Sequence, residues 1–99
     1  MDKYSQDIYL YQDEIGIYQM QIQLARNNII SINPSEIVYN TSESECTIGL
    51  VNNNVISQPG YLCYLIDVDD IYFYKRFFII YIEYTRKGNV YTCPIAYEY

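Results

Sequence analysis

The chain has 99 residues with a net charge of −6, and 14 of them are tyrosine while histidine and tryptophan are both absent. Without histidine the chain lacks the commonest general base and the commonest metal ligand. The acidic charge disfavours direct binding of nucleic acid, because such binding needs lysine and arginine to neutralise phosphates. The length predicts a single domain over residues 1–99 that buries its own core.

Charged residues make up only 18% of the chain, and six of them are basic. Acid denaturation usually follows protonation of paired carboxylates and charging of buried histidines. The second route is closed here and the small number of bases limits the first. We therefore expect unusual tolerance of low pH.

The first fifteen residues fit either a helix or a short strand, and we favour the helix. The apolar residues are spaced as on one helical face, and Gly16 stands where a C-cap glycine would follow. Residues 8–11 also read as a strand because they are aromatic and β-branched or apolar. The residues of the predicted helical face are Tyr4, Ile8, Tyr11 and Ile15.

Residues 17–33 predict a hairpin. Apolar and polar residues alternate over 18–25, which is typical of a strand with one buried face. Asn27 and Asn28 favour a tight turn before a second strand. The following Asn33-Pro34-Ser35-Glu36 predicts the start of a short helix, with Asn as the cap and Pro in the first turn.

The rest of the chain predicts strands. Thr47–Val51 and Val55–Ser57 flank an asparagine turn, and Tyr61–Val68 follows the turn at Pro59-Gly60 as a central strand, since both its faces are apolar.

Residues 71–84 fit a buried helix or one or two strands, and their β-branched and aromatic content favours strands. Val90–Tyr97 closes a hairpin within residues 75–97, with Pro94 indicating an edge. We predict an α+β fold that is mainly antiparallel β, with about five to seven strands in hairpins and one or two short helices.

The three cysteines have no spacing typical of a metal site. We expect all three to be reduced, small buried apolar side chains. The alternative is one disulfide, for which Cys63 and Cys93 are the better pair because both lie in strand-like runs. The third cysteine is Cys46.

Asp67, Asp69 and Asp70 form the best candidate metal or catalytic site, because clustered carboxylates bind Mg²⁺ or Ca²⁺. No calcium-loop pattern surrounds them, so we favour the interpretation that they end a strand and cap a turn. Glu83 precedes Arg86 and Lys87 without the spacing of a nuclease site. We expect no metal, no cofactor and no enzymatic activity, since no cysteine or serine has a histidine to activate it.

Six tyrosines of the C-terminal strands are candidates for a contact surface, because some of them must face outward on alternating strands. The competing interpretation is that tyrosine fills the core and favours strands in a chain with three phenylalanines. The candidates are Tyr72, Tyr74, Tyr81, Tyr84, Tyr91 and Tyr97.

The bias toward tyrosine, isoleucine and asparagine, the small size and the missing histidine resemble the small orphan proteins of filamentous viruses that infect hot-acid archaea, the lipothrixviruses and rudiviruses. AT-rich bacteriophages give the same bias. The resemblance implies an acid-stable and thermostable accessory or virion-associated protein in the host cytoplasm, and it brings no catalytic residues.

We predict a non-enzymatic protein that acts through contacts with a protein partner or with further copies of itself. The first alternative is an acidic inhibitor of a host protein that handles nucleic acid, and the second is a small metal-dependent hydrolase built on the aspartate cluster. The N-terminal sequence is too polar for a signal peptide. The longest apolar runs are too short to span a bilayer, so we expect no membrane insertion.

Overall fold

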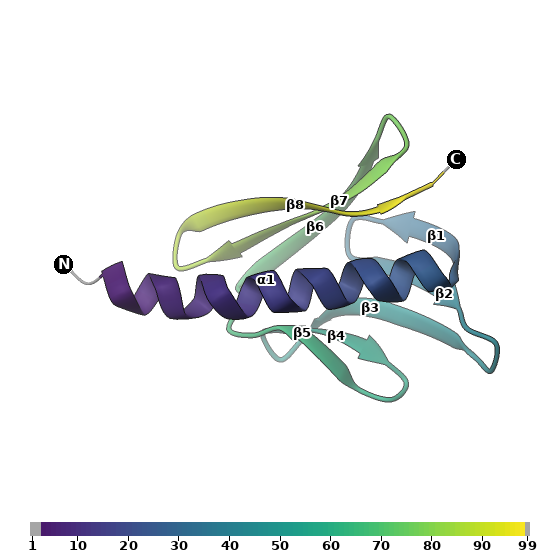
Figure 1. Ribbon diagram of the computed structural model, residues 1–99, viewed down its shortest axis with the longest axis horizontal. Coiled ribbons are helices and arrows are strands. Elements are labelled where there is room, and N and C mark those ends of the chain that lie inside the picture. Colours follow the sequence, from purple (N-terminus) through teal and green to yellow (C-terminus); the bar gives the residue numbers. More distant parts are fainter. Residues whose placement is uncertain (1–2, 99) are drawn as a thin grey trace.

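The computed structural model describes the backbone of residues 3–98 and the side chains of residues 9–98. The helix α1 lies across two antiparallel sheets, and it contacts β5 of one sheet and β8 of the other (Figure 1). The described residues form one compact domain that is mainly β, as predicted, but they contain eight strands rather than five to seven, and one helix of 24 residues rather than one or two short ones. The elements are α1 (Lys3–Arg26), β1 (Asn28–Asn33), β2 (Glu36–Asn40), β3 (Glu45–Val51), β4 (Asn54–Gln58), β5 (Leu62–Leu65), β6 (Asp70–Arg76), β7 (Ile79–Arg86) and β8 (Asn89–Tyr97).

The predicted hairpin over 17–33 is wrong, because its first half belongs to α1. The predicted helix exists but runs on to Arg26, and Gly16 lies inside it rather than at its end. The helix stops where the Asn27 side chain donates a 2.7 Å hydrogen bond to the Gln23 carbonyl oxygen. Arg26 in the last turn also interacts favourably with the negative end of the helix dipole.

The apolar alternation over 18–25 misled the prediction because α1 has apolar residues on two opposite faces. Met20 and Leu24 are buried against the sheets, at 0% and 3% exposure. Tyr18, on the other side, is 62% exposed. Two helical stripes interleaved in this way place an apolar residue at every second position, which imitates the period of a strand.

The predicted helix start at Asn33 is also wrong, since residues 33–36 form the turn between β1 and β2. Asn33 Oδ1 accepts hydrogen bonds from the backbone N–H groups of Ser35 and Glu36, both at 3.0 Å. These are the bonds that a helix N-cap makes, but asparagine makes them equally well in a tight turn. The sequence pattern therefore indicated the correct hydrogen bonds for Asn33, but the element that follows is a strand and not a helix.

One sheet has five strands in the order β1-β2-β3-β4-β5. The predicted hairpin around Asn52 and Asn53 is confirmed as β3 and β4, and both asparagines have positive φ. A strand within Tyr61–Val68 is confirmed as β5, but its predicted central position is wrong, because β5 is short and lies at the edge of the sheet. The helix α1 packs against β5, with Gly16 beside the Tyr64 carbonyl group.

The other sheet has three strands in the order β6-β7-β8. The strand interpretation of 71–84 is confirmed as two strands joined at Phe77 and Phe78, and the hairpin of β7 and β8 is confirmed as well. Pro94 lies in β8 at the sheet edge, as predicted. The Phe73 backbone N–H donates to the Pro34 carbonyl oxygen at 3.0 Å, which joins this sheet to the first.

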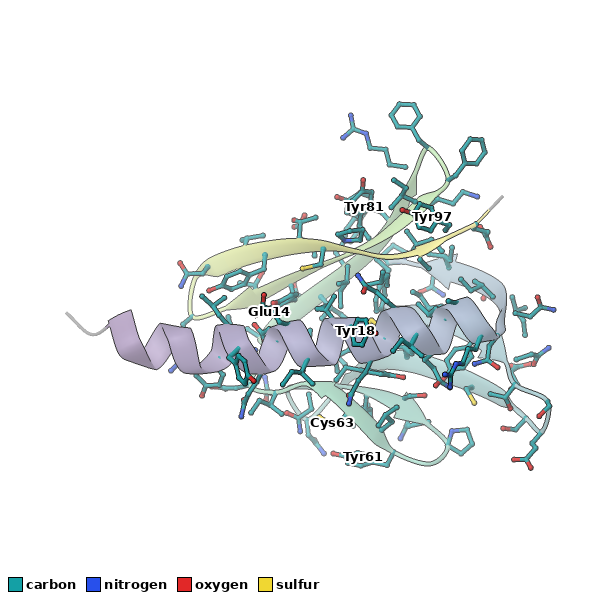
Figure 2. The ribbon with its side chains drawn as sticks, in the orientation of Figure 1. Glu14, Tyr18, Tyr61, Cys63, Tyr81 and Tyr97 are labelled. Atoms are coloured by element: carbon teal, nitrogen blue, oxygen red, sulfur yellow. The ribbon has the colours of Figure 1, made fainter. Side chains whose placement is uncertain are left out.

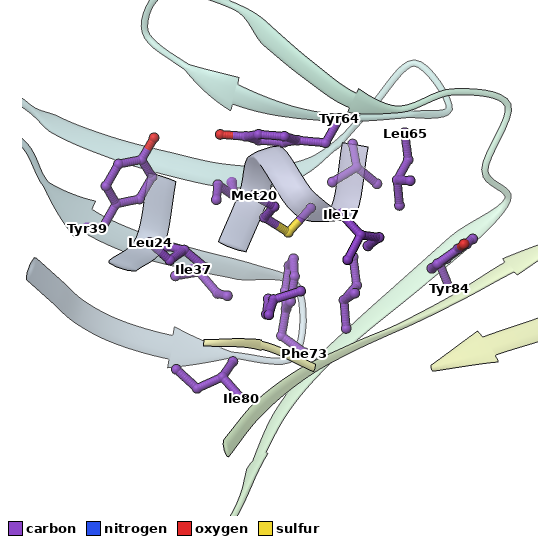
Figure 3. Packing of buried hydrophobic residues seen from close by; sticks show 14 of the residues in the cluster. Ile17, Met20, Leu24, Ile37, Tyr39, Tyr64, Leu65, Phe73, Ile80 and Tyr84 are labelled. Atoms are coloured by element: carbon purple, nitrogen blue, oxygen red, sulfur yellow. The ribbon is translucent and has the colours of Figure 1, made fainter. Parts of the chain in front are cut away.

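The core forms where α1 meets both sheets (Figure 3). Gly16 lets α1 approach β5 closely, because a Cβ at this position would overlap the Tyr64 carbonyl oxygen. The helix contributes Ile17, Met20 and Leu24, the first sheet Ile37, Tyr39, Ile48, Val55, Tyr64 and Leu65, and the second sheet Phe73, Ile80, Ile82, Tyr84 and Ile95.

Candidate interaction surface

The side of α1 that faces away from the sheets has large apolar side chains. Tyr11 is 68% exposed, Ile15 is 47% exposed and Tyr18 is 62% exposed, and the half-buried Ile22 continues the row. Figure 2 shows Tyr18 on this side of the helix. Spacings of four, three and four residues keep these side chains on one helical face. We call Tyr11, Ile15, Tyr18 and Ile22 the outward stripe.

The outward stripe contains two of the four residues that the sequence predicted to lie on one face of a helix. Tyr11 and Ile15 do lie on one face, but that face is exposed. The other two, Tyr4 and Ile8, have side chains outside the described residues. The residues that pack inward are Asp13, Gly16, Ile17, Met20 and Leu24.

A groove of about 890 Å³ runs between α1 and β8. Tyr18 contributes to one wall and Tyr91 to the other, while Glu14 supplies a carboxylate. A second hollow, of about 220 Å³, lies between α1 and β5, and Ile15 and Ile66 are on its wall. The helix is therefore a ridge between two hollows, and the outward stripe adjoins both.

A buried ion pair lies below the larger groove. Asp13 and Arg86 are 4% and 3% exposed. Arg86 Nη1 donates to Asp13 Oδ2 at 2.8 Å and Nη2 donates to Oδ1 at 2.9 Å, which is the two-pronged geometry that guanidinium and carboxylate favour. The Tyr84 hydroxyl also donates to Asp13 Oδ2, at 2.8 Å. These bonds attach α1 to β7.

Arg86 also holds the chain that leads out of β5. It donates to the carbonyl oxygens of Ile66 at 2.8 Å and Asp67 at 3.1 Å. The ring of Tyr9 lies 4.4 Å from the guanidinium carbon, in the range of a cation–π contact. With its donors occupied in this way, Arg86 joins α1, β7 and the connection that follows β5.

Burial raises the pKa of three groups around the larger groove and the core. Burial, with the hydrogen bond to Asp13, raises the pKa of Tyr84 well above its usual range. Burial likewise raises the pKa of Tyr64. It also raises the pKa of Cys93, whose thiol is therefore less nucleophilic at neutral pH than a free cysteine.

The predicted contact tyrosines divide between the two faces of the three-stranded sheet. Tyr84 is buried, and it stacks on the half-buried Tyr91 with ring centroids 5.1 Å apart. On the opposite face Tyr74 stacks on Tyr81 at 5.1 Å, and Tyr72 follows at 5.8 Å from Tyr74. The exposed residues of the six are Tyr72, at 48%, and Tyr97, at 69%.

The three aspartates of the candidate metal site accept hydrogen bonds from three different groups. Asp67 Oδ2 accepts from the Tyr9 hydroxyl at 2.9 Å, and Asp69 Oδ2 accepts from the Lys87 backbone N–H at 2.9 Å. Asp70 Oδ1 accepts from the backbone N–H of the next residue at 2.9 Å. Among the residues that the structure describes, no histidine, cysteine, aspartate or glutamate side chains gather in a group fit to hold a metal ion.

The cysteines and the nuclease-like charges also lie apart in the structure. Cys46, Cys63 and Cys93 are free thiols in the structure, and Cys46 is buried as predicted, whereas Cys63 and Cys93 are half-buried. Arg86 bonds with Asp13 rather than with Glu83, which lies on the opposite face of β7.

Within residues 3–98, the structure contains no helix that is both long and apolar enough to cross a bilayer. The chain matches no protein-family model, and no curated protein or solved structure matches it either.

Proposed function

We propose that this protein is a non-enzymatic interaction protein whose partner contacts are made by the outward stripe of α1. The observation that carries the proposal is the exposure of Tyr11, Ile15 and Tyr18 in one row, at 68%, 47% and 62%. Single exposed apolar residues are ordinary on any protein surface, but a contiguous row with hollows on both sides is typical of a binding surface.

The chemistry of the row favours a protein over other partners. Tyrosine combines a large apolar ring with a polar tip, which suits it to the centre of protein interfaces. The net charge of −6 disfavours a nucleic acid, whose phosphates would be repelled. A protein surface with an apolar row of its own complements the stripe best.

The acidic-inhibitor alternative has less support, because the acidic residues are dispersed. Glu43 lies in the turn between β2 and β3, and Asp69 lies in the connection between β5 and β6, well apart along the molecule (Figure 1). The hydrolase alternative is also less favoured, since the three aspartates are bonded to separate groups. The viral origin suggested by the composition stays a prediction.

The test is retention of proteins on the immobilised chain, from a lysate of its source that is supplemented with untagged chain, at low and high salt. We compare the wild type with Ile15→Lys, which places a charge in the stripe. The matched control is Ile30→Lys, which makes the same substitution at a 49% exposed isoleucine on β1, outside both hollows beside α1. We expect retention that persists in high salt, is lost in Ile15→Lys and is kept in Ile30→Lys.

Retention that is identical in all three proteins would place the contact elsewhere and contradict the proposal. Retention that disappears at high salt would instead support the acidic inhibitor, whose binding is electrostatic. Circular dichroism of both variants establishes that the lysine has not unfolded the chain.

A further inference from the structure

The outward stripe has the spacing of a coiled-coil seam. Its residues follow one another at intervals of four, three and four, as the two core positions of a heptad do. Isoleucine occupies one of these positions, in Ile15 and Ile22, and tyrosine occupies the other, in Tyr11 and Tyr18. In the sequence the alternation extends to Ile8 and Tyr4, whose side chains lie outside the described residues.

We propose that the partner of the outward stripe is a second copy of this chain, whose α1 packs antiparallel against it across a two-fold axis. This inference rests on the proposed function and names its partner. A two-fold interface must be complementary to itself. The stripe meets that condition, because in an antiparallel pair Ile15 lies opposite Tyr18 of the second copy and Tyr11 lies opposite Ile22.

The polar residues beside the stripe allow two acidic chains to approach. Gln12 and Gln19 lie on one side and Glu14 and Gln21 on the other. In the antiparallel register Glu14 lies opposite Gln21 of the second copy, so no like charges face each other. Antiparallel helices also bring opposite dipole ends together. Between residues 11 and 22, Glu14 is the one charged residue beside the stripe, since Asp13 is buried.

The size of the outward stripe determines how stable a dimer we expect. Four residues from 11 to 22 extend over about 16 Å of helix, at roughly 1.5 Å per residue. Stable complexes bury about 800 Å² per partner, and a single helical stripe covers less than that. We therefore expect a reversible dimer whose population depends on concentration, and not an obligate one.

Sedimentation equilibrium of the purified chain, over low micromolar to millimolar concentrations, tests the inference. We expect a monomer–dimer equilibrium in the wild type and in Ile30→Lys. Ile15→Lys should raise the dimer Kd about tenfold or more, because a lysine in the centre of the seam loses its hydration in the dimer. Circular dichroism again checks that each variant is folded.

A mixing experiment tests the antiparallel register. Ile15→Lys and Tyr18→Glu should each be monomeric alone, whereas their mixture should form a heterodimer in which the introduced lysine of one chain faces the introduced glutamate of the other. The dimer has two contacts between Ile15 of one chain and Tyr18 of the other, and the heterodimer keeps one of them unchanged. An altered fold would weaken each variant but would not produce recovery on mixing.

A wild type that stays monomeric at every concentration overturns the dimer, as does a dimer that Ile15→Lys leaves unchanged. A mixture that fails to associate overturns the antiparallel register. These outcomes are distinct from failure of the proposed function. A monomeric chain that still retains another protein through Ile15 would keep the proposed function and remove only the second copy.

Discussion

The two faces of α1 have similar apolar content and opposite environments. Ile15 and Ile17 are two residues apart, yet Ile15 is 47% exposed and Ile17 is 7% exposed. The inward face also contains a glycine and a charged residue, Gly16 and Asp13, which a purely apolar interface would not need. The outward face is a regular row of isoleucine and tyrosine.

This difference indicates that the inward face fits one particular surface of the same chain. The outward face, with its regular row of isoleucine and tyrosine, is suited to a partner that has an equally regular apolar row. Gly16 is matched to the backbone at Tyr64, and Asp13 is matched to the donors of Arg86 and Tyr84. Substitutions on the inward face should therefore affect folding. Substitutions on the outward face should affect association and leave folding unchanged.

The largest expected effect comes from Asp13→Ala. Removing one partner of a buried ion pair leaves the other charge without compensation, and we expect a loss of about 3–5 kcal/mol in the free energy of unfolding. Urea denaturation followed by circular dichroism measures it. The double variant Asp13→Leu/Arg86→Met removes both charges and should recover part of the loss, because the Tyr84 hydroxyl and the carbonyl oxygens of Ile66 and Asp67 still lose their partners. A single variant as stable as the wild type would show that Arg86 is solvated.

The isoleucine pair gives the next effect and the cleanest contrast between the faces. Ile17→Ala leaves a cavity in the core and should cost about 2–4 kcal/mol. Ile15→Ala, measured at a concentration where the chain is monomeric, should change stability by less than about 1 kcal/mol. Equal losses in the two variants would contradict the exposure of the outward face.

Gly16→Ala should destabilise the fold although alanine is the better helix former. In an exposed helix the change gains about 1 kcal/mol. Here the added methyl group overlaps the Tyr64 carbonyl oxygen, so α1 must move away from β5, and we expect a net loss of about 1–3 kcal/mol. Gln19→Ala, on the exposed side of α1, is the control. A gain of stability in Gly16→Ala would show that the helix moves without cost.

The sequence predicted most of the β structure because hairpins are local. Asn52 and Asn53 adopt the positive φ that a tight turn requires, and their type alone indicates the turn. The position of Pro94 at a sheet edge also follows from its missing N–H. These signals need no knowledge of the rest of the fold.

The helix and the surface could not be predicted in the same way. Whether Tyr11 or Ile17 faces inward depends on where β5 and β8 lie, and the helical spacing fits both faces equally well. The salt bridge of Asp13 and Arg86 joins positions 73 residues apart. The sequence predicted that Gly16 ends a helix. A glycine is needed here because the backbone of Tyr64 lies against it, and Tyr64 is distant in sequence.

The smallest effect should appear at alkaline pH, at the tyrosines beside the inward face. Burial raises the pKa of Tyr64 and Tyr84 in the folded protein, whereas unfolded tyrosines ionise near pH 10. Above that pH the unfolded chain loses protons that the folded chain keeps, so stability falls as pH rises. The fall is at most about 1.4 kcal/mol per pH unit for each of these residues. Absorbance at 295 nm should show their ionisation only on unfolding, and Tyr84→Phe should reduce the pH dependence by about half.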